Sequence, residues 1–79
     1  DVYPNPSRDV FNITFNSDVI QDLNIKIFNS IGQVIFDDFK HQYVGEYVKQ
    51  LNLENYSKGV YLLEIQTGQD LINKKLILK

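Results

Sequence analysis

The chain lacks cysteine, methionine, tryptophan and alanine altogether, and it has only two prolines and four glycines among its 79 residues. Without cysteine it can form no disulfide, no thiolate nucleophile and no cysteine-ligated zinc site. No apolar run approaches the ~20 residues that a membrane-spanning helix needs. The missing alanine and methionine also argue against a helical bundle, which is normally rich in strong helix formers.

Net charge is also small. Eight basic residues stand against ten acidic ones, a net charge of −2, so nothing indicates a nucleic-acid partner. The apolar 43% consists of valine, isoleucine, leucine, phenylalanine and tyrosine, most of which favour strands, and it suffices for a core. The chain begins with Asp1 rather than Met and shows no leader, so we expect one domain, residues 1–79, taken from a larger precursor.

Apolar and polar residues alternate in several short runs, which is the pattern of half-buried β-strands. The runs cover residues 10–15, 23–28, 33–39, 47–53, 60–67 and 71–79. Residues 29–32 and 67–70 have the composition of tight turns, whereas the polar residues 37–46 and 54–59 are expected to be loops. Six or seven strands with short antiparallel connections predict an all-β fold of two sheets packed face to face.

The same alternation predicts which side chains form the core. The expected inward set is Phe11, Ile13, Phe15, Leu23, Ile25, Ile27, Val34, Phe36, Tyr47, Leu51, Leu53, Tyr61, Leu63, Ile65, Ile72, Leu76 and Leu78. Lys49 falls on the face of Tyr47, so it must lie at an edge or extend its amine to solvent. Gly32 is expected to take a positive φ in its turn, and Tyr61 to be a core or tyrosine-corner residue. Tyr43 and Tyr47 are the two tyrosines that would suit an exposed, sugar-stacking role.

Few residues could carry chemistry. His41 is the only histidine, and neither Ser30 nor Ser57 is flanked like a strained nucleophile elbow, which favours an exposed loop histidine. Asp37 and Asp38 are adjacent and point to opposite faces of a strand, which suits neither a carboxylate pair nor a calcium loop. The sequence therefore predicts no catalytic residue, no metal and no cofactor.

The last six residues carry three of the seven lysines, Lys74, Lys75 and Lys79. Lysines on a terminal strand protect an exposed edge from unwanted pairing. A basic terminal strand is equally suited to recognition by a partner. Sequence alone leaves these two interpretations open.

Four segments together resemble a known family. They are Tyr3-Pro4-Asn5-Pro6-Ser7, residues 25–34 with Gly32, residues 51–53 followed by Gly59-Val60-Tyr61, and Lys74-Lys75-Leu76-Ile77-Leu78-Lys79. In this order they resemble the C-terminal sorting domains of the type IX (Por) secretion system of Bacteroidota. The two prolines fix φ and make a stiff entry to the first strand, so the motif is expected to have a folding role.

The resemblance implies an Ig-like β-sandwich of about seven mostly antiparallel strands that acts as a non-catalytic secretion signal. Such a domain would be fused to an N-terminal cargo and recognised in the periplasm by the type IX translocon. A sortase-like peptidase would remove it after passage across the outer membrane, and the cargo would be anchored to the cell surface or released. Residues 74–79 are the expected recognition strand, acting by strand addition and charge. The same strand, if uncovered, could pair between copies.

Two other classes of protein stay open on the residues alone. An Ig- or fibronectin-like accessory module for glycan binding or domain spacing would present exposed aromatic side chains on one sheet face. A small enzyme would depend on His41, the sole histidine.

Overall fold

The computed structural model describes residues 1–79 and contains five β-strands and no helix. The strands are β1 (Val2–Tyr3), β2 (Val10–Phe28), β3 (Val34–Asn52), β4 (Gly59–Gln66) and β5 (Leu71–Leu78). The prediction of an all-β fold is therefore confirmed. No segment is a helix of the length and apolar character that crossing a membrane requires.

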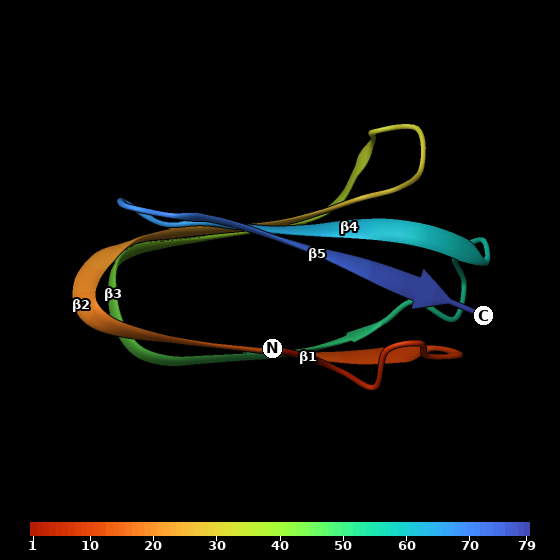
Figure 1. The fold of residues 1–79 in the computed structure, drawn as a ribbon, viewed down its shortest axis with the longest axis horizontal. Helices are drawn as coiled ribbons and strands as arrows, with labels where there is room; N and C mark the ends of the chain where they lie inside the picture. The colour runs from red at the N-terminus through yellow and green to blue at the C-terminus, as the bar shows by residue number, and fades with distance from the viewer.

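Two strands of 19 residues each, β2 and β3, form an antiparallel hairpin that organises the whole molecule. β1 pairs with the N-terminal half of β2, and β4 pairs with its C-terminal half. β5 then pairs with β4, again antiparallel. The hairpin bends back on itself, so the single sheet curls into two facing layers, and β5 crosses obliquely from one toward the other (Figure 1).

The bend of the hairpin is built from irregular backbone and local hydrogen bonds. On β2, register shifts flank Gln21, and on β3, Gln42 and Gly45 have φ values of 49° and 101°. The buried hydroxyl of Ser17 donates to a main-chain carbonyl at 2.6 Å and accepts from the Gln21 amide at 2.9 Å. Bulges of this kind turn a strand without ending its pairing.

The bend corrects the expected strand count and loop assignment. Residues 37–46 belong to β3 rather than to a loop, and residues 16–22 belong to β2. Each bend joins two of the expected short strands into one, so the structure has five strands where about seven were expected. The loop assignment was wrong because the outside of a bent strand is polar, and composition does not distinguish it from a loop.

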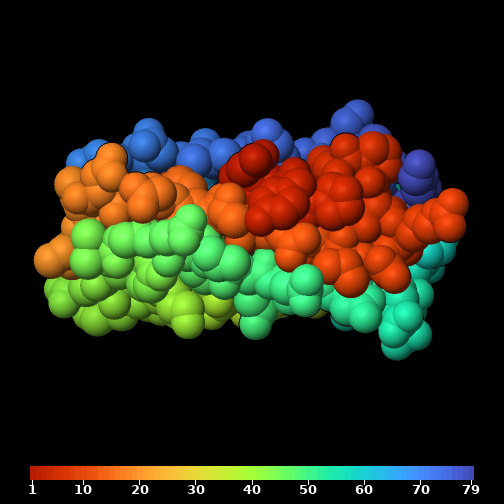
Figure 2. All heavy atoms as spheres, turned by 90° about the horizontal axis from the view of Figure 1, so that it is seen from below, coloured from red at the N-terminus to blue at the C-terminus, as the bar shows by residue number.

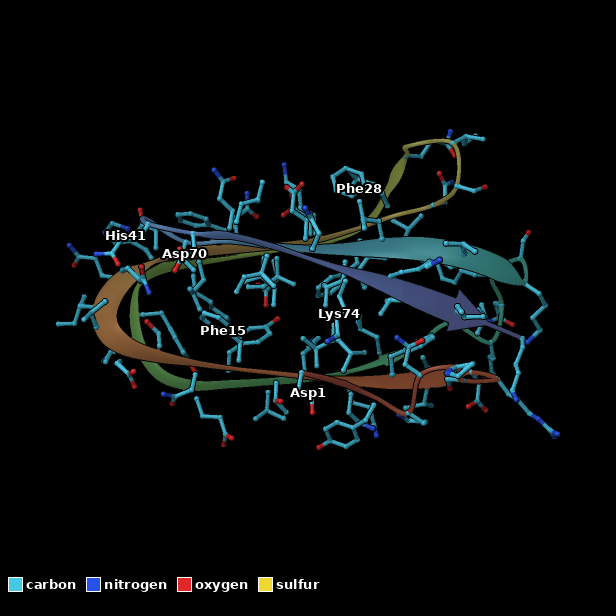
Figure 3. The ribbon with its side chains drawn as sticks, in the orientation of Figure 1. Asp1, Phe15, Phe28, His41, Asp70 and Lys74 are labelled. Carbon is cyan, nitrogen blue, oxygen red and sulfur yellow. The ribbon has the colours of Figure 1, made fainter.

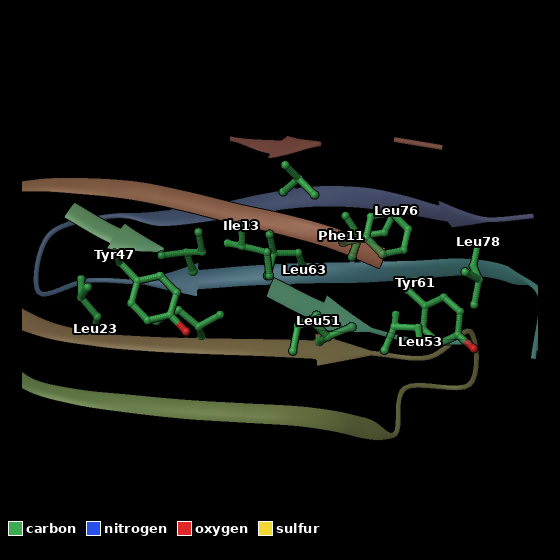
Figure 4. Close-up of a cluster of buried hydrophobic side chains, with 14 residues drawn as sticks. Phe11, Ile13, Leu23, Tyr47, Leu51, Leu53, Tyr61, Leu63, Leu76 and Leu78 are labelled. Carbon is green, nitrogen blue, oxygen red and sulfur yellow. The ribbon is translucent and has the colours of Figure 1, made fainter. Parts of the chain in front are cut away.

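The core lies between the two layers and draws on every strand (Figure 4). Its members alternate along β2, β4 and β5 much as predicted. The buried apolar set is Val2, Phe11, Ile13, Leu23, Ile25, Ile27, Tyr47, Leu51, Leu53, Tyr61, Leu63, Ile65, Leu76 and Leu78. Lys49 is exposed, as predicted, and its amine lies 5.9 Å from the centre of the Phe36 ring.

Two predicted core residues are exposed, namely Val34 and Ile72, at 49% and 39%. Two others, Phe15 and Phe36, are only partly buried and pack against the core. At Val34 the register with β2 shifts, and Ile35 packs against the core in its place. The exposed role suggested for Tyr43 and Tyr47 is also wrong, since Tyr47 is in the core and Tyr43 packs against it.

Candidate recognition site

The expected recognition strand forms β5 and alternates between core and solvent. Leu76 and Leu78 are 0% and 1% exposed, whereas Ile77 between them is 38% exposed. The register with β4 runs without a shift from Leu78 to Leu71. β5 is thus a regular strand anchored by two core residues near its C-terminal end.

The three C-terminal lysines remain free on this anchored strand. Lys74, Lys75 and Lys79 are all exposed, and none of them is in an ion pair. Strand alternation places Lys74 on the inner face of β5, toward the space between the two layers (Figure 3). By the same alternation Lys75 is on the outer face. The lysines therefore present positive charge on both sides of one strand.

The proline-containing motif near the N-terminus lies against the C-terminal end of β5 (Figure 2). The Ser7 N–H donates to the Ile77 carbonyl at 3.0 Å, and the Ser7 carbonyl accepts from the Lys79 N–H at 2.8 Å. The Asn5 side chain adds two bonds: Nδ2 donates to the Lys75 carbonyl at 2.8 Å, and Oδ1 accepts from the Ile77 N–H at 3.0 Å. This contact could not be predicted from the sequence, because the two segments are far apart in the chain and no local pattern in either one indicates its partner.

Ser7 is the buried residue of this motif, and its hydroxyl donates to the Val10 carbonyl at 2.5 Å. Tyr3, Pro4 and Pro6 are exposed. The exposed prolines have no N–H to donate, and the hydrogen bonds between the motif and the C-terminal end of the chain come from Asn5 and Ser7. The motif is therefore a structural contact of the terminal strand as well as an entry into the first one.

The glycines singled out in the sequence occupy backbone positions that favour glycine. Gly32 has a φ of 84° in the turn between β2 and β3, as predicted, and its N–H donates to the Asn29 carbonyl at 3.0 Å. Gly59 has a φ of 144° where the chain enters β4. Two residues later Tyr61 is buried, and its hydroxyl donates to the Ser57 carbonyl at 2.5 Å, which closes the preceding connection.

A hollow of about 550 Å³ lies between the turn after β2 and the outer face of β4 and β5. Its lining residues are Phe28, Asn29, Ser30, Gly32, Val60, Tyr61, Leu62, Glu64 and Lys75. Val60 and Leu62 are 48% and 41% exposed on this face. Lys75 is the one residue of the expected recognition strand that borders it.

The candidate catalytic residues are not brought together. His41 lies in β3 at the bend, rather than in a loop, and its Nδ1 is 3.1 Å from an Asp22 carboxylate oxygen (Figure 3). Ser30 and Ser57 line a separate hollow beside the turn at the other end of the hairpin. No group of three or more histidine, cysteine or acidic side chains is placed to hold a metal ion.

Asp38 has a structural contact that its neighbour Asp37 lacks. Asp38 accepts a hydrogen bond from the Tyr47 hydroxyl at 2.8 Å, while Asp37 is exposed. Burial, followed by this hydrogen bond and the charge of Asp38, raises the pKa of Tyr47 well above its ordinary value. The bond joins the two halves of β3 across the inside of the bend.

A family model described as "Secretion system C-terminal sorting domain" matches residues 1–79, the full length of the chain. The chain belongs to this family. The resemblance drawn from the four sequence segments is thereby confirmed, and the sorting domain is a secretion signal rather than a catalyst. Family membership implies recognition by the type IX machinery, fusion to an N-terminal cargo, and export to the cell surface or extracellular space.

The sorting domain is also similar to part of a larger protein, an "Endo-acting ulvan lyase" of Formosa agariphila. The two are 30% identical over 79 residues, which cover 99% of this chain and 14% of the relative. The sorting domain therefore spans about a seventh of the length of the relative that it matches.

Proposed function

We propose that residues 1–79 form a single C-terminal domain of a longer precursor and address its cargo to the type IX translocon. In this scheme the precursor passes through the periplasm, and the translocon recognises the folded domain. A sortase-like peptidase then removes it, with the cargo anchored to the surface or released. The family match along the whole chain is the observation that supports this scheme.

We further propose that the curled sheet is a variant of the Ig-like sandwich. The bends divide β2 and β3 into two segments each, and these four segments with β1, β4 and β5 make seven. The register shifts around Gln21 support this division. An experimental structure in which pairing is interrupted at both bends is expected, and uninterrupted pairing there would contradict it.

Within the domain, we propose β5 as the strand that the translocon contacts. Within the expected recognition segment, residues 74–79, the accessible residues are Lys74, Lys75, Ile77 and Lys79, whereas Leu76 and Leu78 belong to the core. We assign folding roles to Tyr3, Pro4, Asn5, Pro6, Gly32, Gly59 and Tyr61. The recognition role rests on exposure, because a partner contacts groups that solvent also reaches. The folding roles rest instead on backbone conformation at the prolines and glycines and on the contacts of Tyr3, Asn5 and Tyr61.

An export assay tests the sorting function. Residues 1–79 are appended to a signal-peptide-bearing fluorescent protein and expressed in a Bacteroidota host and in a translocon knockout. Surface or medium fluorescence in the wild type only is the expected result. Periplasmic retention in both strains, with a folded domain, would contradict a sorting function.

Point substitutions locate the contact better than truncation does. Deleting residues 75–79 removes two core leucines and would unfold the domain whatever the translocon reads. The triple variant Lys74→Gln, Lys75→Gln, Lys79→Gln keeps the core, and we expect it to lose most export. Lys26→Gln, Lys40→Gln, Lys58→Gln is the matched control for charge. Equal export by both variants would exclude the terminal lysines from recognition.

A further inference from the structure

The outer edge of β5 is divided into two unequal parts. The backbone groups of Ile77 point away from β4, since its N–H bonds Asn5 and its carbonyl bonds Ser7. In an antiparallel ladder the direction of the backbone N–H and carbonyl groups alternates from residue to residue. The backbone groups of Leu71, Asn73 and Lys75 therefore also point away from β4. Of this outward row, only the C-terminal part has partners.

The partners come from residues 5–7, which we call the strap. Its contacts follow the pattern of a short parallel strand, with Ser7 opposite Leu78. The Asn5 amide presents one donor and one acceptor to β5, as a peptide group would, next to a proline that has no N–H. The strap therefore occupies the edge from the Lys75 carbonyl to the Lys79 N–H.

The rest of the edge, from Leu71 to the Lys75 N–H, is open. No strand lies beside it, and Asn73 is in no hydrogen bond to the strap. This part has no proline and no bulge, two of the devices that close an edge. Its backbone is accordingly in the geometry that a further strand requires.

We propose that residues 71–75 are a docking edge for an extended, acidic segment of a partner, and that the strap keeps the remainder of β5 closed to it. The charge follows from Lys74 and Lys75, which are exposed and free of ion pairs on opposite sides of the edge. Acidic side chains on both faces of an added strand would meet these two amines. This inference deepens the proposal that the translocon contacts β5.

Hydrogen exchange on residues 1–79 tests the division of the edge without any export step. We expect the Ile77 N–H to be protected and the Asn73 N–H to exchange rapidly. Asn5→Ala should speed exchange at Ile77 by about tenfold. Leu76, whose N–H points to β4, reports global unfolding and should not change. Asn55→Ala is the control, and equal exchange at Ile77 and Asn73 in the wild type would overturn the strap.

A pair of peptides tests whether the docking edge prefers an acidic segment. The probes are an eight-residue peptide that repeats Glu-Glu-Val-Val, which puts acidic side chains on both faces of an added strand, and the same peptide with Lys in place of Glu. We expect the acidic peptide alone to protect Asn73, and in Asn5→Ala to protect Ile77 as well. Lys74→Glu with Lys75→Glu should reverse the preference. Equal binding of both peptides, docking at another strand, or protection of Asn73 by self-association alone would overturn the proposal.

These outcomes separate the two proposals. If the exchange and peptide results fail while the fusion is exported, the docking edge is wrong and the sorting function stands. If both experiments on the edge succeed while the fusion stays in the periplasm, the edge exists but the sorting function is wrong. Sedimentation of the unliganded chain at several concentrations reports the self-pairing alternative directly.

Discussion

A single side-chain hydrogen bond joins the two halves of the bent strand β3. The Tyr47 hydroxyl reaches Asp38 across the inside of the bend, and Tyr43 packs edge-on against the Tyr47 ring at 6.3 Å between centroids. Asp38 is inward-facing on a strand whose outer face carries Asp37. The adjacent acids thus differ in role because alternation sends one to a tyrosine and the other to solvent.

The raised pKa of Tyr47 predicts how stability depends on pH. Above pH ~10 the unfolded chain releases the phenolic proton while the folded chain retains it, so the free energy of unfolding falls as pH rises. Tyr47→Phe should remove up to about 1.4 kcal/mol per pH unit of this slope. Urea denaturation at pH 9, 10 and 11 measures it. Tyr56→Phe, at an exposed tyrosine, should keep the slope, and an unchanged slope in Tyr47→Phe would contradict the prediction.

The elements depend on a few backbone positions where the chain changes direction. Gly59 begins β4 with a φ of 144°, a region that residues with a Cβ rarely adopt. No atom lies within 4 Å of where its Cβ would be, so any cost of substitution comes from the backbone and not from crowding. The positive φ at this position, rather than a lack of room for a side chain, explains why the residue is glycine.

Gly59→Ala should therefore destabilise the domain by about 1–3 kcal/mol. Gly68→Ala is the matched control, because its φ is not in the left-handed region and its nearest neighbour is the Gln21 side chain at 3.8 Å. We expect the control to change stability by less than about 1 kcal/mol. Urea midpoints compare the two variants, and equal losses would show that φ is not the reason.

Short-range features of these elements could be predicted from sequence, and long-range ones could not. Alternation placed Leu23, Ile25 and Ile27 in the core because period two is a local property. Whether residues 16–22 end a strand or bend it depends on the hydrogen bonds of Ser17 and on pairing with β3, which are tertiary. The strap was missed for the same reason, since Asn5 and Ile77 are 72 residues apart.

The whole molecule has one thin core between two layers, so neighbouring residues of one strand contribute very differently. Leu76 is fully buried, whereas Ile77 is 38% exposed on the outer face. Leu76→Ala should cost about 2–5 kcal/mol, a large part of the roughly 5–15 kcal/mol that stabilises a domain. Ile77→Ala should cost less than half as much. Thermal denaturation measures both, and equal losses would place the core elsewhere.

The contact between the strap and β5 also bears on how the protein is made. Residue 5 leaves the ribosome long before residue 77 is synthesised. Because these two residues are hydrogen-bonded in the folded domain, folding cannot be completed until the last strand has been made. A chain that stops before β5 lacks Leu76, Leu78 and the partners of the strap together. Because the address folds only after its last strand has been made, a polypeptide that terminates within the cargo carries no folded address.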